Sequence, residues 1–163
     1  MKTVSTDELR NWLWSCLAVS RWVEDVLAQE PFATPADLLR AAREAATPLS
    51  RAEVTEALAV RARNVQPARD GAAEHSVSMG GARAVHAQDE ALSVSLAEGS
   101  LLYLKKFGRV FLTRTQGRSP QEVLNELNRR LELSDAADAS TVARELRDIA
   151  LLQLAKHVAR ETE

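Results

Sequence analysis

The stretch SPQEVLNELNRRL, residues 119–131, decides the fold class, because it carries the signals of a capped amphipathic helix. Ser119 can accept a hydrogen bond from the helix start, Pro120 suits the first turn, and Glu122 completes a capping box. Apolar residues then recur three and four positions apart, as one face of a helix requires. They are Val123, Leu124, Leu127 and Leu131. This stretch predicts a helix with one buried face.

Similar helix starts occur along the rest of the chain. Ser5 with Glu8 and Ser50 with Glu53 have the spacing of a capping box, and each pair precedes an apolar stripe. The predicted helices begin at Ser5, at Ser20 as a capping residue, at Thr34, at Ser50, at Asp89 (ending at Lys106), at Ser119 and near Ser140. The sequence therefore predicts an all-α, single-domain bundle of about seven or eight helices.

The composition is that of a soluble globular protein. The chain has 163 residues, of which 45% are hydrophobic and 27% are charged, so residues 1–163 are expected to form one domain. The net charge of −2 and the lack of a long apolar run predict no nucleic-acid partner and no membrane segment. The lone Cys16 cannot form an internal disulfide, which favours the reducing cytoplasm.

Two stretches break the helical pattern. Residues 62–88 contain one proline and three glycines with poor periodicity, and predict a long loop of the kind that is usually functional or mobile. Val110, Phe111 and Leu112 form a short apolar run that is expected to cross the core in extended form. Its backbone groups need partners, which could be a ligand with a polar ring, neighbouring side chains or water.

Several motifs occur in the order known from one enzyme family. They are Tyr103, Phe107-Gly108, the apolar run 110–112, Gly117-Arg118-Ser119, Glu122-Val123-Leu124 and Arg130-Leu131, with earlier agreement from Cys16 to Leu58. Together they resemble the 2-oxo-4-hydroxy-4-carboxy-5-ureidoimidazoline (OHCU) decarboxylase family over nearly the whole chain. The resemblance implies that family's all-α fold, a homodimer, and a decarboxylation that needs no cofactor and yields allantoin.

The resemblance also implies where the family's site residues fall. The family uses a His in a His-Pro-Arg-Ile-Gly motif, a loop Ser, a Glu-Gln pair about twenty residues later, and an Arg in the last helix. Aligned without gaps from residues 56–58, these positions fall on Arg61 for the His, Arg63 for the motif's Arg, Ser78 for the Ser, Gly81 and Ala82 for the Glu-Gln pair, and Gln153 for the last Arg. A gapped alignment places Gln66-Pro67 on His-Pro and supplies no His either. The framework is kept while the catalytic side chains are replaced.

Arg61 continues the apolar face of Val54, Ala57 and Leu58. An arginine there either extends to solvent at the helix end or serves as a fixed cation for a carboxylate or enolate. It cannot act as a general base near neutral pH, but it can stabilise developing negative charge. Gln153 also lies on an inward stripe, where its amide could make a structural hydrogen bond or contact a ligand.

The long loop offers little chemistry to replace the family's residues. His75 is the only nearby candidate for a replacement acid or base. Gly81 and Ala82 would leave a larger and less polar pocket, which suggests a different ligand or none.

Two other groupings are open to more than one interpretation. His86, Asp89 and Glu90 could be metal ligands, but one histidine with acids at a helix start favours capping, so no metal site is predicted. The basic residues between Lys105 and Arg118 alternate with phenylalanines, as in some nucleic-acid-binding proteins. The family pattern explains those phenylalanines as core residues.

Three functions follow from the sequence, and whether the protein is an enzyme is open. In the first, the pocket is adapted to another small anionic or heterocyclic substrate for decarboxylation, cyclisation or isomerisation. Arg61 would be its electrostatic element, and Gln153, Ser78 and the backbone of residues 110–112 would bind the substrate; the high Ala and Arg content suggests bacterial specialised metabolism. In the second, catalysis is lost and the protein binds a ligand or serves as a scaffold. In the third, it is a true OHCU decarboxylase in which His75 replaces the base.

Overall fold

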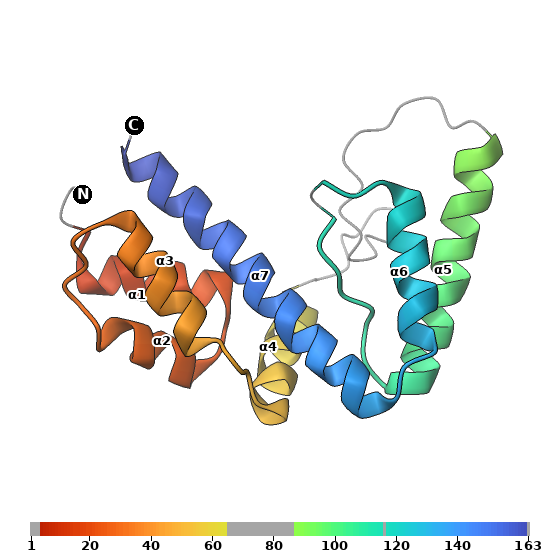
Figure 1. Cartoon of the computed structure of the whole chain (residues 1–163), viewed down its shortest axis with the longest axis horizontal. Helices are drawn as coiled ribbons and strands as arrows, with labels where there is room; N and C mark the ends of the chain where they lie inside the picture. Colours follow the sequence, from red (N-terminus) through yellow and green to blue (C-terminus); the bar gives the residue numbers. More distant parts are fainter. Residues whose placement is uncertain (1–3, 65–86, 116, 163) are drawn as a thin grey trace. The chain divides into compact units, whose positions relative to one another are not determined.

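The computed structural model describes residues 4–64, 87–115 and 117–162, and within these ranges every regular element is a helix (Figure 1). This confirms the all-α prediction. The elements in chain order are α1 (Thr6–Cys16), α2 (Ser20–Leu27), α3 (Pro35–Ala45), α4 (Arg51–Asn64), α5 (Ala87–Phe107), α6 (Pro120–Leu131) and α7 (Asp135–Thr162).

Most helices begin where their capping residues predict. The Thr34 and Ser119 side chains each accept from the backbone of the third helical residue in a complete capping box. The prediction for Ser20 was wrong, because Val19 is the residue that precedes α2 and Ser20 is its first residue. The Ser20 hydroxyl lies 3.2 Å from a carboxylate oxygen of Glu56 and donates to it. The Ser20 backbone amide donates to the same Glu56 oxygen at 3.4 Å, so a carboxylate of α4 serves the start of α2 in place of a local side chain.

The last helix begins earlier than predicted. It starts at Asp135 and not near Ser140, because the Ser134 hydroxyl caps it by accepting from the Ala137 amide at 3.2 Å. Ser140 lies inside the helix and donates to the Ala136 carbonyl. Since both serines have helix-favouring residues after them, local sequence does not distinguish the two starts.

Both ends of the stretch 62–88, which was predicted to be a loop, are helical. Residues 62–64 continue α4, and residues 87–88 already belong to α5. Residues 65–86 lie outside the described part of the chain. In the part that is described, no helix is both long enough and apolar enough to cross a membrane.

The chain divides into two compact units. One comprises Met1–Val65 with Ala143–Glu163, and the other comprises Gln66–Val142. In the first unit, α1, α2 and α3 pack around Trp22, which is fully buried and donates from its indole nitrogen to the Ala42 carbonyl at 2.8 Å. Cys16 is buried in the same unit, and burial raises the pKa of its thiol to about 11.

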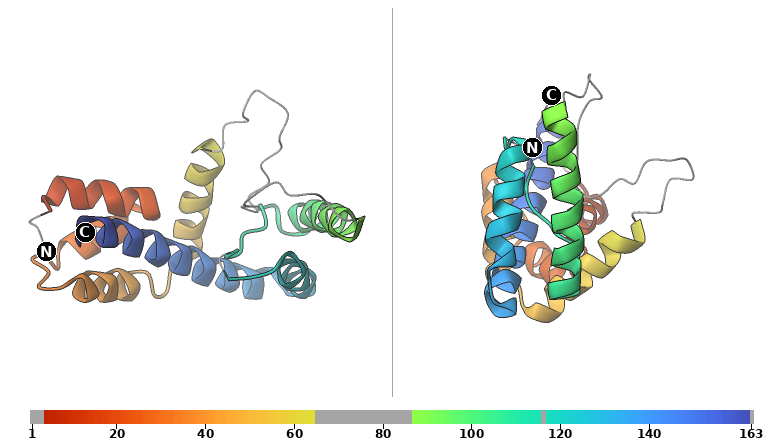
Figure 2. Two further views of the ribbon diagram at one scale, coloured as in Figure 1. Left: turned by 90° about the horizontal axis from the view of Figure 1, so that it is seen from above. Right: turned by 90° about the vertical axis from the view of Figure 1, so that its right-hand side faces the viewer.

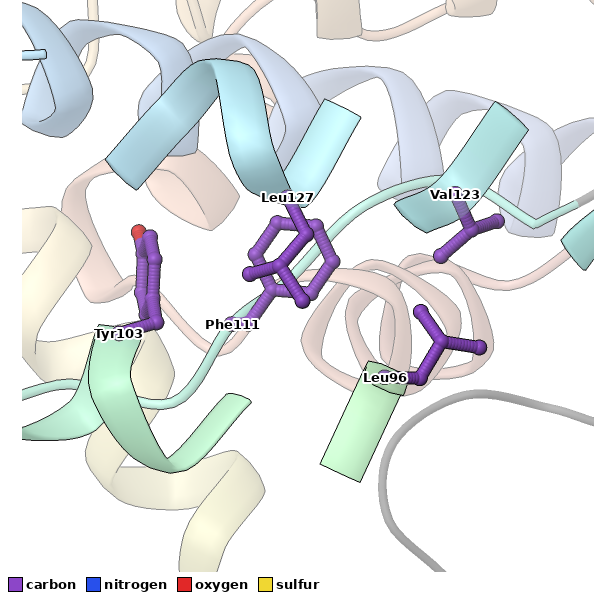
Figure 3. Close-up of a cluster of buried hydrophobic side chains, with 5 residues drawn as sticks. All are labelled: Leu96, Tyr103, Phe111, Val123 and Leu127. Carbon is purple, nitrogen blue, oxygen red and sulfur yellow. The ribbon is translucent and has the colours of Figure 1, made fainter. Parts of the chain in front are cut away.

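In the second unit, α5 and α6 lie side by side and run in the same direction (Figures 1 and 2). The segment between them returns along the pair. Figure 3 shows the resulting core, in which side chains from both helices enclose one from the returning segment. The buried members are Leu96 and Tyr103 of α5, Phe111 of the segment, and Val123 and Leu127 of α6. Phe111 of the apolar run 110–112 therefore lies in this core, whereas Val110 is exposed.

Gly99 of α5 lies close against α6, because a Cβ atom added there would lie 2.7 Å from the Leu127 Cδ2 atom. Leu127 is fully buried and has little space to move. Gly99→Val is expected to lower the free energy of unfolding by about 1–3 kcal/mol through overpacking. Urea denaturation measures this, with Ser95→Val as the control because Ser95 is exposed on the same helix. Equal effects of the two variants would contradict the close approach.

Candidate functional site

Arg61 lies in the last turn of α4, on the side of the helix that carries the buried Val54 and Ala57. Its side chain is half-buried, and it has no hydrogen bond or ion pair with any described residue. Burial lowers the pKa of its guanidinium below the ordinary value. Arg63, two residues later, is exposed and its Nε donates to the Ala59 carbonyl of the same helix at 3.3 Å. The two predicted arginines thus differ: Arg61 is a partly desolvated cation without a described partner.

Gln153 lies on α7 in the same unit, after the buried Leu146 and Ala150 on its inward stripe. It is half-buried, and no described residue makes a hydrogen bond with its amide. Because a half-buried amide usually finds a partner, this side chain can bind a ligand or water.

The segment after α5 contributes backbone groups. Gly108 ends the helix with a positive φ of 66°, and its amide donates to the Leu104 carbonyl at 2.8 Å. Phe111 and Leu112 are buried, whereas Val110 is 52% exposed. No backbone–backbone hydrogen bond joins residues 110–112 to any described residue. The segment therefore presents polar backbone groups that a ligand with ring donors and acceptors could satisfy.

Arg130 of α6 holds this segment in place. Its guanidinium is fully buried and donates to the Leu112 carbonyl and to the Tyr103 hydroxyl. It also lies about 5.0 Å from the ring centre of Phe111 and 5.1 Å from that of Tyr103. Among the backbone carbonyls of residues 110–112, that of Leu112 has a partner in the described part of the chain. This partner is the buried Arg130 cation.

Asp138 of α7 neutralises this cation. Its carboxylate accepts from Arg130 Nε at 2.7 Å, from Arg109 Nη2 at 2.7 Å and from the Tyr103 hydroxyl. Burial alone would raise the pKa of Asp138, but the hydrogen bonds from Arg130, Tyr103 and Arg109 outweigh it, and the pKa lies below its ordinary value. Burial and the bond to Asp138 raise the pKa of Tyr103. Arg130, Asp138 and Tyr103 are fully buried and bonded to one another, so the cluster holds the segment in place.

The ion cluster was not predicted, although Tyr103 and Arg130 both belong to the motifs of the family resemblance. Arg130 follows Val123 and Leu127 at helical spacing, which is the argument that singled out Arg61. Asp138 could not be placed, because the last helix was predicted to begin after it.

Four predicted positions, namely His75, Ser78, Gly81 and Ala82, lie outside the described residues. Among the residues that are described, no group of three or more His, Cys, Asp or Glu side chains is placed to hold a metal ion.

A hollow of about 640 Å³ opens on the first unit, and no predicted site residue lines it. Its charged side chains include Arg21, Asp25 and Glu53. Arg21 donates to Asp25 at 2.6 Å and to Glu53, and the bond from Arg21 lowers the pKa of Glu53 to about 2. Arg21 is the cation among the described lining residues, and it is paired in this way, so the hollow does not present an unpaired described cation to an anionic ligand.

Comparisons with known proteins agree with this architecture. No curated protein sequence matches the chain. A crystal structure described as OHCU decarboxylase in the presence of (S)-allantoin is similar, with a TM-score of 0.67 and 23% identity, over 92% of this chain and 98% of that one. A structure of (S)-allantoin synthase has a TM-score of 0.61 and 15% identity, over 94% of this chain and 51% of that chain, so this chain spans about half of it. At these identities the two structures show the fold alone.

The sequence comparison shows the family as well as the fold. The family model of OHCU decarboxylase matches residues 2–155, which include all seven helix starts and the core of both units. The chain belongs to the OHCU decarboxylase family.

Proposed function

We propose that the protein is a divergent family member whose site binds a small anionic or heterocyclic molecule other than the family's substrate, and transforms it without a cofactor by decarboxylation, cyclisation or isomerisation. One observation carries the proposal: Arg61 is a half-buried guanidinium that no described residue neutralises. A desolvated cation is strongly attracted to a carboxylate or enolate. The family places its catalytic histidine at this position by the ungapped alignment.

In this proposal Arg61 stabilises negative charge that develops on the substrate, and the amide of Gln153 binds a polar group of it. The resemblance to the family adds the backbone of residues 110–112 as a binding group for ring N–H and C=O groups, and this backbone has no backbone partner among the described residues. Arg63 and the loop residues Ser78, Gly81 and Ala82 are included as further binding positions by alignment with the family. A cytoplasmic location and a homodimer complete the proposal, and the first fits a single cysteine that is buried and unpaired.

Binding without catalysis is the second candidate, because neither of the two described site side chains transfers a proton. Arg61 stays protonated and Gln153 is neutral, so neither can take a proton from a substrate. His75 would have to supply that step in an active enzyme, including a true OHCU decarboxylase.

Arg61→Ala tests the proposal directly. We expect small cyclic carboxylates to stabilise the wild-type protein in thermal denaturation, in a manner that grows with ligand concentration. Removing a charge-assisted hydrogen bond is expected to weaken their binding about tenfold to a hundredfold, as isothermal titration calorimetry would show. Neutral allantoin should lose less, because it has no carboxylate for Arg61 to bind.

Two further variants make the test specific. Arg43→Ala removes the same charge from an exposed position in the last turn of α3 and should leave binding unchanged. Arg61→Lys keeps the charge but lacks the planar guanidinium, so it should bind more tightly than Arg61→Ala and less tightly than wild type. Equal affinity of wild type and Arg61→Ala for every carboxylate that binds would refute the role of Arg61. NMR measurement of product formation distinguishes an enzyme from a protein that binds the ligand without transforming it.

A further inference from the structure

Trp12 of α1 and His157 of α7 form a stacked pair of rings in the first unit. Their ring centres lie 5.5 Å apart, and their planes differ by 14°. The left view of Figure 2 shows α1 alongside the C-terminal half of α7. Both side chains are half-buried, and each is next in sequence to a buried residue, Leu13 and Val158 respectively. The pair thus lies at the edge of the core and not within it.

The indole ring is the described partner of the His157 imidazole. His157 has no hydrogen bond and no ion pair with another described residue. Among the described side chains, the charged groups nearest along the two helices are Glu8, one turn before Trp12, and Lys156 and Arg160 on α7. All three are exposed, so water and salt screen their effects, and none forms an ion pair with His157. A change in the charge of His157 therefore acts first on the contact with Trp12.

The charge of the imidazole changes what this contact is. Histidine gains or loses its proton between about pH 5 and pH 8. A neutral imidazole attracts the indole mainly by dispersion, whereas a cation within about 6 Å of the centre of an indole ring is also attracted electrostatically by the face of the ring. The distance of 5.5 Å lies within that range. The protonated form of His157 therefore binds Trp12 more strongly than the neutral form does.

We infer that the pair formed by Trp12 and His157 is a pH-sensitive contact, which holds α1 against α7 more firmly when His157 is protonated. The unfolded chain lacks this contact, so the ring favours the charged form in the folded protein alone. The added stability is therefore fully present below about pH 6.5, where an unfolded histidine is charged, and is lost as the pH rises above that range. Because α1 also packs against α2, the contact secures both helices to α7 in acid. The inference does not rest on ligand binding at Arg61.

A double-mutant cycle at two pH values tests the inference. The four proteins are wild type, Trp12→Leu, His157→Gln and the double variant, and urea denaturation gives the unfolding equilibrium constant of each. The coupling between the two positions is expected to be about twofold to fivefold larger in this constant at about pH 5 than at about pH 8. The other two histidines of the chain are present in all four proteins, so their titration cancels.

Trp14 provides the matched control. It lies on the same helix, is 45% exposed, and makes no ring contact with a described residue. A cycle that combines Trp14→Leu with His157→Gln should therefore show the same coupling at both pH values. Equal coupling of Trp12 and His157 at the two pH values, or a pH-dependent coupling of the same size for Trp14, would overturn the inference.

Tryptophan fluorescence gives a readout that does not depend on unfolding. A charged imidazole quenches the fluorescence of an indole stacked on it. The folded wild type should therefore lose fluorescence between about pH 8 and about pH 5, and the loss should be smaller in His157→Gln. Quenching in acid that His157→Gln retains in full would show that His157 does not carry its charge against Trp12.

Discussion

Asp138→Ala is expected to destabilise the protein by about 3–5 kcal/mol, because it leaves a fully buried arginine without its counter-ion. The Asp138 carboxylate accepts from Arg130, Arg109 and Tyr103, and both Arg130 and Asp138 are fully buried. In the variant, the guanidinium of Arg130 would keep the Leu112 carbonyl and the Tyr103 hydroxyl but no negative charge. Urea denaturation followed by circular dichroism measures the loss.

Asp135→Ala is the control for this result. Asp135 also bonds to Arg109, at 2.9 Å, but its side chain is 45% exposed, so its removal should cost less than about 1 kcal/mol. Asp138→Asn keeps an acceptor without the charge, so its loss of stability should lie between those of Asp138→Ala and Asp135→Ala. Similar losses from Asp135→Ala and Asp138→Ala would contradict a buried ion cluster.

The effect of Asp138 should depend on pH in a defined direction. Its pKa is lower in the folded protein than in the unfolded chain, so its contribution to stability is present above the unfolded pKa of about 3.9 and is lost as the pH falls through the folded value. The difference in stability between wild type and Asp138→Asn should therefore shrink in acid.

Trp22→Ala is expected to cost about 3–5 kcal/mol in the other unit, because it removes the largest fully buried side chain of the core. The indole also donates to the Ala42 carbonyl at 2.8 Å, and the variant would leave that acceptor without this partner. Trp22→Phe restores most of the apolar volume and should cost less, with the remaining loss due to the hydrogen bond and the smaller ring. Thermal and urea denaturation give the ranking.

Trp14→Ala provides a comparison within the same unit. Trp14 lies on α1 and is 45% exposed, so its loss should change the free energy of unfolding by less than about 1 kcal/mol. Equal losses in the free energy of unfolding from Trp14→Ala and Trp22→Ala would contradict the packing of α1, α2 and α3 around Trp22.

Helix positions were predictable where the signal is local. Thr34, Ser50 and Ser119 were identified as helix starts, and each one forms the predicted hydrogen bond within three residues of itself. The predictions for Ser20 and Ser140 failed because both serines lie within a helix and not before it. The Glu56 carboxylate that accepts from Ser20 lies 36 residues away, and no local rule reaches it.

The sequence by itself determined the helical class and the family, because caps, apolar periodicity and motif order are all properties of neighbouring residues. It also indicated that Arg61 lies on an inward stripe. Only the tertiary structure decided what each inward arginine meets. Arg130 finds Asp138, Tyr103 and the Leu112 carbonyl, while Arg61 meets no described partner. The physical reason is that a buried charge is neutralised by groups from other elements, which the fold brings together.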